Sequence, residues 1–343
     1  MVGTEPFDEP WAAGQYAAVR RRTRALVEEF ARQPGSSGRR VDRATWARVI
    51  EAMNDANRHL ARCDGVWLEM RALYLEVMAG NAVRFRVRRE GWAASILTAC
   101  RYLGPDHEIT ERMKRARDSA DWYGRQPASG TLRQGLKVAA DVDRHLGELA
   151  VGKLRRAALK FEHLSLVIAT VAVKRYEAAE GDAAVAIAGL GAELCHDLGE
   201  VEIARALFKP FYEEVSAVTP EGVDDLLLLA EARTRMGTME LLNGDAAAAE
   251  PLVRTVERDL QPSPRFAGVR RAQHRRWMRA LDDANALLAD CLFVGGKRNE
   301  AGRHYREAYE GYLTAGGEGP GYTERLSAAF NAAVFTAGAW WKV

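Results

Sequence analysis

Apolar residues recur three and four positions apart along almost the whole sequence, and this spacing constrains the fold more than any other feature. Side chains spaced in this way share one face of an α-helix, whereas the two faces of a strand alternate with a period of two. Such alternation is confined to Val83, Phe85 and Val87. A single strand would lack a partner, so we prefer a helix there too. The sequence therefore predicts an all-α fold.

Short turns separate the candidate helices, with glycine where one helix ends and Asp, Asn or Glu where the next begins, as is typical of helix caps. A longer break over 126–130 is the candidate boundary between two regions. We expect a flexible N-terminus over 1–10, an N-terminal helical region over 11–126 and a second helical region over 131–343. The candidate helices span 10–32, 43–61, 65–79, 82–103, 106–123, 131–180, 182–197, 200–218, 221–243, 245–260, 269–294, 298–315 and 322–341.

The composition excludes several classes of protein. Hydrophobic residues make up 48% of the chain and charged residues 28%, which is typical of a folded, soluble protein. The net charge of +2 gives no overall reason to expect nucleic acid or an anionic membrane as partner. Neither a bilayer-spanning run nor a secretory signal is recognisable, and four widely spaced cysteines fit a reducing compartment. We expect a cytoplasmic protein that does not bind membranes.

Three segments of the second region share a pattern of small, glycine and larger apolar positions. In this pattern a glycine closes a turn, small residues let the second helix approach the first, and a larger residue fills the gap between them. The most complete copy lies within 282–315, and the third is the weakest. The three sets are Leu288, Ala289, Leu292, Gly296, Ala301, Tyr305 and Ala308; Met236, Gly237, Gly244, Ala249, Val253 and Val256; and Val173, Gly181, Ala186 and Leu190.

This pattern resembles the tetratricopeptide repeat, in which antiparallel helix pairs stack on their neighbours. The resemblance implies that 131–343 is a TPR-like repeat region, a right-handed array of antiparallel helix pairs or α-solenoid. The chain departs from the family at Glu240, where an aromatic residue is usual, and at Lys174, which takes the place of Gly237. The turn glycines are 63 and 52 residues apart, so the repeats are degenerate. An ordinary α-helical domain with alanine-rich pairs is the alternative.

The resemblance also implies a function, namely non-catalytic binding of a protein or peptide segment by a scaffold or adaptor. In such repeats the first helix of each pair lines the ligand groove. Here the groove residues are acidic and small, which favours a basic or apolar ligand over a C-terminal carboxylate. They are Glu231, Thr234, Thr238 and Leu241 in one repeat, and Asp283, Ala286, Asp290 and Phe293 in the next.

Clusters of arginine suggest a second kind of binding. On a helix, Arg271, Arg275 and Arg279 form one stripe, and guanidinium groups can hold phosphate or carboxylate in bidentate geometry. The alternative is a solvated face that pairs with nearby acids such as Asp282 and Asp283. A nucleic-acid partner is less favoured, because no DNA- or RNA-binding consensus is present. Similar clusters occur at Arg20, Arg21, Arg22 and Arg24, and at Arg84, Arg86, Arg88 and Arg89.

Motifs for catalysis are lacking in the sequence. There is no phosphate-binding loop, nucleophile elbow or His-Glu-x-x-His zinc motif. Glu193 and His196 would supply half of a di-iron site, but a second Glu-x-x-His is missing. His304 follows Glu300 by four residues, which is not sufficient for a site. The acidic pair Asp224 and Asp225 lies at a helix start, where acids favour the helix dipole. We expect no catalytic residues, no metal ion and no cofactor.

Three alternatives remain open at this point. The helix over 322–341 carries aromatic residues that either pack internally or form a homodimer contact. The protein could be a ligand- or peptide-responsive regulator, similar to the peptide-pheromone receptors of Gram-positive bacteria but without a DNA-binding head. It could also be a metal-dependent enzyme on an all-α scaffold, which metal analysis would reveal.

Overall fold

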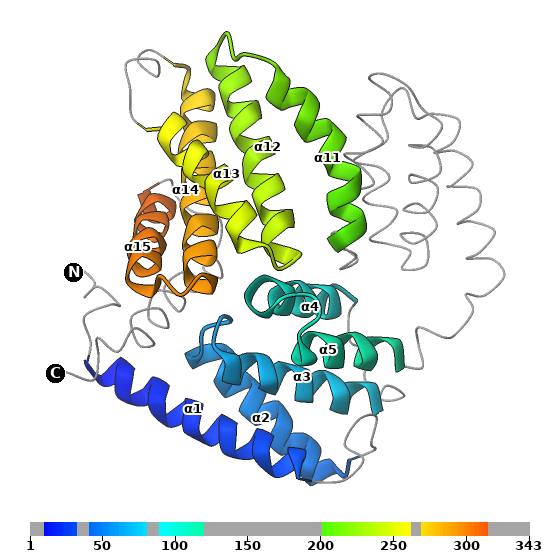
Figure 1. Cartoon of the computed structure of the whole chain (residues 1–343). Helices are drawn as coiled ribbons and strands as arrows, with labels where there is room; N and C mark the ends of the chain where they lie inside the picture. Colours follow the sequence, from blue (N-terminus) through cyan, green and yellow to red (C-terminus); the bar gives the residue numbers. More distant parts are fainter. Residues whose placement is uncertain (1–9, 33–40, 81–88, 120–200, 262–268, 315–343) are drawn as a thin grey trace.

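The computed structural model describes residues 10–32, 41–80, 89–119, 201–261 and 269–314. All regular structure within these residues is helical, so the predicted all-α class is confirmed (Figure 1). In the same part of the chain, no helix combines the length and apolar character needed to cross a bilayer. The helices are α1 (Pro10–Ala31), α2 (Arg43–His59), α3 (Gly65–Gly80), α4 (Arg89–Leu103), α5 (Glu108–Ser119), α11 (Val201–Ala217), α12 (Val223–Leu242), α13 (Ala246–Asp259), α14 (Arg271–Val294) and α15 (Arg298–Thr314).

Side-chain caps explain where several helices begin. Asp42 accepts a hydrogen bond from the backbone N–H of Thr45 at 2.7 Å, and Asp245 accepts one from Ala248 at 2.8 Å. Asp225 accepts from the N–H of Gly222 just before α12, which agrees with the helix-start interpretation of this acidic pair. The predicted helices within 131–197 and 322–341, the boundary over 126–130 and the segment Val83–Val87 lie outside the described residues.

The N-terminal helices pack around α3, which is buried on nearly every side. Helices α1 and α2 contact α3 and each other, and α5 packs on both α3 and α4. Asp64 joins α1 to the start of α3, since its carboxylate accepts from Tyr16 Oη at 2.5 Å and from Arg20 Nε at 2.9 Å. The same carboxylate caps α3 through the N–H of Val66. A single buried acid thus sets how α1 meets α3.

Helices α12 to α15 form two antiparallel pairs, each closed by a glycine turn. Gly244 between α12 and α13 has φ +87°, and Gly296 between α14 and α15 has φ +79°, a left-handed conformation that favours glycine. A Cβ atom at Gly237 would lie 2.9 Å from Cγ2 of Val253, and Ala249 and Ala301 are fully buried. The close helix approach predicted for these small positions is therefore present.

The N-terminal helices pack directly on this second group. Helix α12 contacts α14, and α4 contacts both of them (Figure 1). The turn after α4 touches the turn after α12, because a Cβ at Gly244 would lie 3.3 Å from Cδ of Pro105. The two apolar cores also interlock: Leu242 of α12 belongs to the N-terminal core, whereas Ala61 and Cys63 belong to the core of α12 to α15. Helix α4 is thereby fixed at one end of the α12–α14 surface.

Three of the four cysteines are buried free thiols, namely Cys63, Cys100 and Cys291. Burial raises the pKa of Cys100 to about 11 and that of Cys291 to about 12. Their thiols therefore stay protonated at neutral pH and behave as small apolar groups. Cys195 lies outside the described residues.

We predict that Asp282 makes stability fall as the pH rises from about 4 to about 7. Its carboxyl is buried against α15, where a Cβ at Gly311 would overlap it, and Oδ2 has no hydrogen-bond partner among the described residues. Burial, together with the charge of Asp283, raises the pKa of Asp282 to about 7. In the unfolded chain this carboxyl loses its proton near pH 3.9, whereas in the folded chain it keeps the proton up to about pH 7. Between these two values the folded state binds more protons than the unfolded state, so the free energy of unfolding falls as the pH rises and levels off above pH 7.

Urea denaturation of the wild type and of Asp282→Asn between pH 4 and pH 8 measures this effect. The asparagine variant should lose the decline in the free energy of unfolding between pH 4 and pH 7. Asp283→Asn, at the neighbouring partly exposed position, should keep most of it, because burial of Asp282 is the larger cause of the raised pKa and the charge of Asp283 the smaller one. Equal pH profiles for the wild type and Asp282→Asn would contradict the assignment.

Candidate functional site

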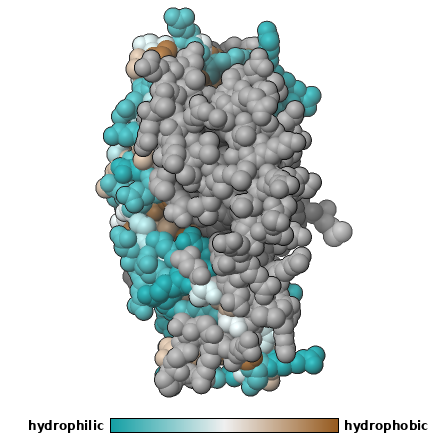
Figure 2. Space-filling view, turned by 90° about the vertical axis from the view of Figure 1, so that its right-hand side faces the viewer, coloured by the Kyte–Doolittle hydropathy of each residue, from teal (hydrophilic) through white to brown (hydrophobic). Residues whose placement is uncertain are grey.

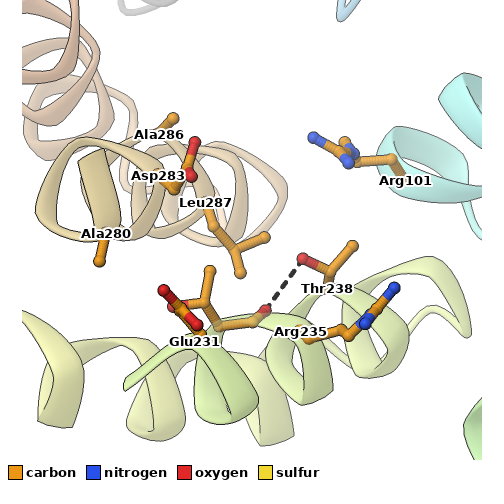
Figure 3. Close-up of a pocket in the computed structure, with 9 residues that line it drawn as sticks. Arg101, Glu231, Arg235, Thr238, Ala280, Asp283, Ala286 and Leu287 are labelled. Carbon is orange, nitrogen blue, oxygen red and sulfur yellow. Dashed lines mark hydrogen bonds between the residues drawn. The ribbon is translucent and has the colours of Figure 1, made fainter. Parts of the chain in front are cut away.

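A pocket of about 380 Å³ lies between α12 and α14, with α4 at one end. The residues on α12 are spaced three and four apart and so share one face of that helix. The lining consists of Arg101 from α4; Glu231, Thr234, Arg235 and Thr238 from α12; and Ala280, Asp283, Ala286 and Leu287 from α14 (Figure 3).

Charges of opposite sign are separated along this pocket. Arg101 and Arg235 lie at one end and Glu231 and Asp283 at the other, with Leu287 between them (Figure 3). Residues of the lining thus provide two guanidinium groups, two carboxylates and an apolar floor.

Each charged residue of the lining is positioned by a neighbour outside it. Arg101 pairs with Asp290 at 2.8 Å, and Arg235 lies over the ring of Phe208 at 5.4 Å from its centroid. Arg276 holds Glu231 in a bidentate pair at 2.6 and 2.7 Å, and this hydrogen bonding raises the pKa of Arg276. Asp283 lies 3.9 Å from Arg279. These pairs hold the side chains of the pocket in defined positions.

The two threonines present oxygen atoms to the pocket. Thr234 donates its hydroxyl proton to the carbonyl of Ala230 at 2.9 Å, and Thr238 donates to the carbonyl of Thr234 at 3.0 Å. A hydroxyl that donates in this way keeps lone pairs with which it can accept from a ligand. The walls therefore offer hydrogen-bond acceptors between the charged ends.

Five of the eight groove residues predicted from the sequence line this pocket, and the other three do not. Glu231, Thr234, Thr238, Asp283 and Ala286 belong to the lining. Leu241 is instead part of the buried core, while Asp290 and Phe293 are covered by α4.

Asp290 is the centre of the contact with α4. Its carboxylate accepts from Arg101 at 2.8 Å, from Tyr102 Oη at 2.8 Å and from Tyr305 Oη at 2.6 Å, and the residue is only 4% exposed. Phe293 meets the edge of the Tyr102 ring at a centroid distance of 6.1 Å. The α4 end of the surface between α12 and α14 is therefore occupied by this same chain.

Sequence reasoning missed Arg101 and Arg235. Arg235 follows Glu231 by one helical turn, so the helical period of α12 could have placed it beside the other pocket residues. Arg101 comes from a helix nearly two hundred residues away in sequence, and no local pattern connects it with α14.

The three arginines of the stripe on α14 are all exposed, and one of them also pairs with an acid. Arg271 and Arg275 are exposed, and Arg279 pairs with Asp283, one of the acids expected for a solvated face. In the arginine cluster of α1, over residues 20–24, Arg20 pairs with Asp64 and Arg22 lies 3.7 Å from Asp55.

One group of side chains has the composition of a metal site. Ligand atoms of Glu257, His304 and Glu307 lie within 4.8 Å of one another. However, Nδ1 of His304 lies 3.2 Å from Glu307 Oε2 and 3.3 Å from Asn285 Oδ1, and Nε2 lies 3.3 Å from the Arg303 guanidinium. Burial lowers the pKa of His304. We assign this group to the packing of α13, α14 and α15. The Glu193 and His196 pair lies outside the described residues.

Exposed apolar side chains are scattered over the described surface. The large ones are Val218, which follows α11, Leu228 on α12 and Val294 at the end of α14. On the face drawn in Figure 2, the described residues that reach the surface are mainly hydrophilic. The pocket between α12 and α14 is therefore the strongest candidate site in this part of the chain.

Searches against protein-family models, curated proteins and solved structures gave no significant match. The function must therefore be argued from the pocket itself.

Proposed function

We propose that the chain is a TPR-like helical array and that it binds a protein or peptide segment, without catalysis, in the pocket between α12 and α14. The observation that carries this proposal is a pocket with both apolar and polar lining between the first helices of two successive pairs, where groove residues of each pair were expected. Threonine and carboxylate oxygens can accept from peptide N–H groups, and Leu287 and the alanines can contact side chains. The antiparallel pairs and their glycine turns support the TPR-like assignment.

An array of short synthetic peptides, each immobilised through its N-terminus, tests the proposal. Every sequence is made twice, once with a free C-terminal carboxylate and once as the C-terminal amide. We expect a subset of peptides to bind, and we expect Thr238→Trp to weaken that binding at least about ten-fold because the indole fills the pocket.

Thr255→Trp is the matched control. Thr255 also donates its hydroxyl to the carbonyl four residues earlier, but it lies on α13 outside the pocket. It should leave peptide binding intact. Binding of no peptide, or equal binding by Thr238→Trp and the wild type, would show that the proposed function is wrong.

A further inference from the structure

We propose that Arg101 and Tyr102 of α4 form an internal stopper over one end of the surface between α12 and α14, and that a peptide with a basic side chain beside an aromatic one displaces it. This inference rests on the proposed function, which requires only that a peptide binds in the pocket. It adds the chemistry of the peptide and a way in which the chain restricts access to its own site.

The stopper occupies predicted groove positions on α14. Asp290 and Phe293 were both expected to line the groove, but they are covered by α4 instead. Arg101 and Tyr102 each donate a hydrogen bond to the Asp290 carboxylate at 2.8 Å. The Tyr102 ring also meets Phe293 edge-on, at 6.1 Å between the ring centroids. Two side chains of the same chain therefore stand where a ligand was expected.

The covered positions define the chemistry that would replace the stopper. A buried carboxylate forms its strongest hydrogen bonds with a guanidinium or ammonium group, and a second ring can keep the edge-on contact with Phe293. Tyr305 donates to the Asp290 carboxylate at 2.6 Å from α15 and is 1% exposed, so this carboxylate keeps one fixed partner when the stopper leaves. A peptide with lysine or arginine next to an aromatic residue offers the same two groups as the stopper.

The stopper can leave while α4 stays in place. Trp92, Ile96 and Ala99 anchor the helix in the N-terminal core and are fully buried. Both stopper residues lie in the last turn of α4 and are partly exposed. Because the peptide supplies a cation and a ring in their place, the buried carboxylate of Asp290 is not left unpaired. Opening therefore costs only the difference between two similar sets of contacts.

Such a stopper selects between ligands. The apparent affinity of a ligand is reduced by the fraction of molecules that can bind it, so a stopper closed in about nine molecules out of ten weakens binding about ten-fold. This reduction applies to peptides that reach Asp290. Peptides that contact only the pocket beside it do not need the stopper to open.

Titration of paired peptides by fluorescence anisotropy tests the inference. The strongest binders of the array are remade as C-terminal amides, with either Arg-Tyr or Ala-Ala at each pair of neighbouring positions in turn. At the placement that reaches Asp290, the Arg-Tyr form should bind the wild type at least about ten-fold more tightly than the Ala-Ala form. Tyr102→Leu, which weakens the stopper, should bind that Arg-Tyr form about ten-fold more tightly than the wild type does and should gain much less for the Ala-Ala form.

Two further variants and one further measurement complete the test. Tyr102→Phe removes only the hydroxyl and should give a smaller gain, so the test does not depend on the folding of Tyr102→Leu. Tyr74→Leu, at a partly buried tyrosine of α3 outside the pocket, is the matched control and should change neither affinity. In the wild type, binding of the Arg-Tyr peptide should accelerate hydrogen exchange in the last turn of α4, whereas the Ala-Ala peptide should not.

The outcomes separate the two proposals. If Arg-Tyr and Ala-Ala peptides bind equally at every placement and both lose binding in Thr238→Trp, the pocket is a peptide site and the stopper inference is wrong. An Arg-Tyr preference that neither variant of Tyr102 increases also overturns the stopper. If no peptide binds, the proposed function fails and the inference fails with it. An Arg-Tyr preference that grows in both variants of Tyr102 supports both proposals.

Discussion

Replacing Asp290 with alanine is expected to lower the free energy of unfolding by about 3 kcal/mol, because one buried carboxylate joins three helices. It accepts hydrogen bonds from Arg101 and Tyr102 of α4 and from Tyr305 of α15. The alanine variant leaves the hydroxyl of Tyr305, which is 1% exposed, without this acceptor, and it removes the carboxylate that pairs with Arg101. Removing one partner of a buried hydrogen-bonded charge lowers the free energy of unfolding much more than removing an exposed ion pair.

Urea denaturation followed by circular dichroism measures the loss. Asp283→Ala is the matched control, since Asp283 lies two turns earlier on the same helix, is partly exposed and is 3.9 Å from its arginine partner. It should change stability by no more than about 0.5 kcal/mol. Asp290→Asn keeps an acceptor and should fall between the two. Hydrogen exchange of α4 should also accelerate in Asp290→Ala. If the two alanine variants were equally stable, Asp290 would not be the attachment point of α4.

Features set by nearby residues could be predicted from the sequence. The helical period and the caps predicted the bounds of the described helices to within a few residues, apart from the start of α4, because both depend on residues within one or two turns. The first seven residues of the helix predicted over 82–103 lie outside the described residues. The tight approach of α12 and α13 could be predicted for the same reason, since Gly237 and Ala249 lie close in sequence and are small.

What covers a helix face could not be predicted in this way. The period of α14 places Asp283, Ala286 and Asp290 on neighbouring parts of one surface, but it cannot tell which of them faces solvent. That depends on α4, which reaches Asp290 through a contact across 189 residues of sequence. Asp283 and Ala286 therefore line the open pocket, whereas Asp290 is covered by α4.

Trp92→Ala is expected to lower the free energy of unfolding by about 3–5 kcal/mol. Trp92 is fully buried in the N-terminal core, and Ile96 and Ala99 follow it on the same face of α4. Arg101 and Tyr102, near the end of the same helix, reach the surface between α12 and α14. Helix α4 thus joins the N-terminal core to the pocket, and Trp92 is its largest apolar contact.

Trp92→Phe separates packing from hydrogen bonding at this position. The Nε1 atom of Trp92 is buried without a hydrogen-bond partner among the described residues, so phenylalanine removes an unsatisfied donor and keeps most of the apolar contact. Trp92→Phe should therefore lower the free energy of unfolding by about 1 kcal/mol. Trp46→Ala, a partly buried tryptophan of α2, should cost less than Trp92→Ala in the same urea titration. A loss in Trp92→Phe as large as in Trp92→Ala would mean that the indole N–H is satisfied in solution.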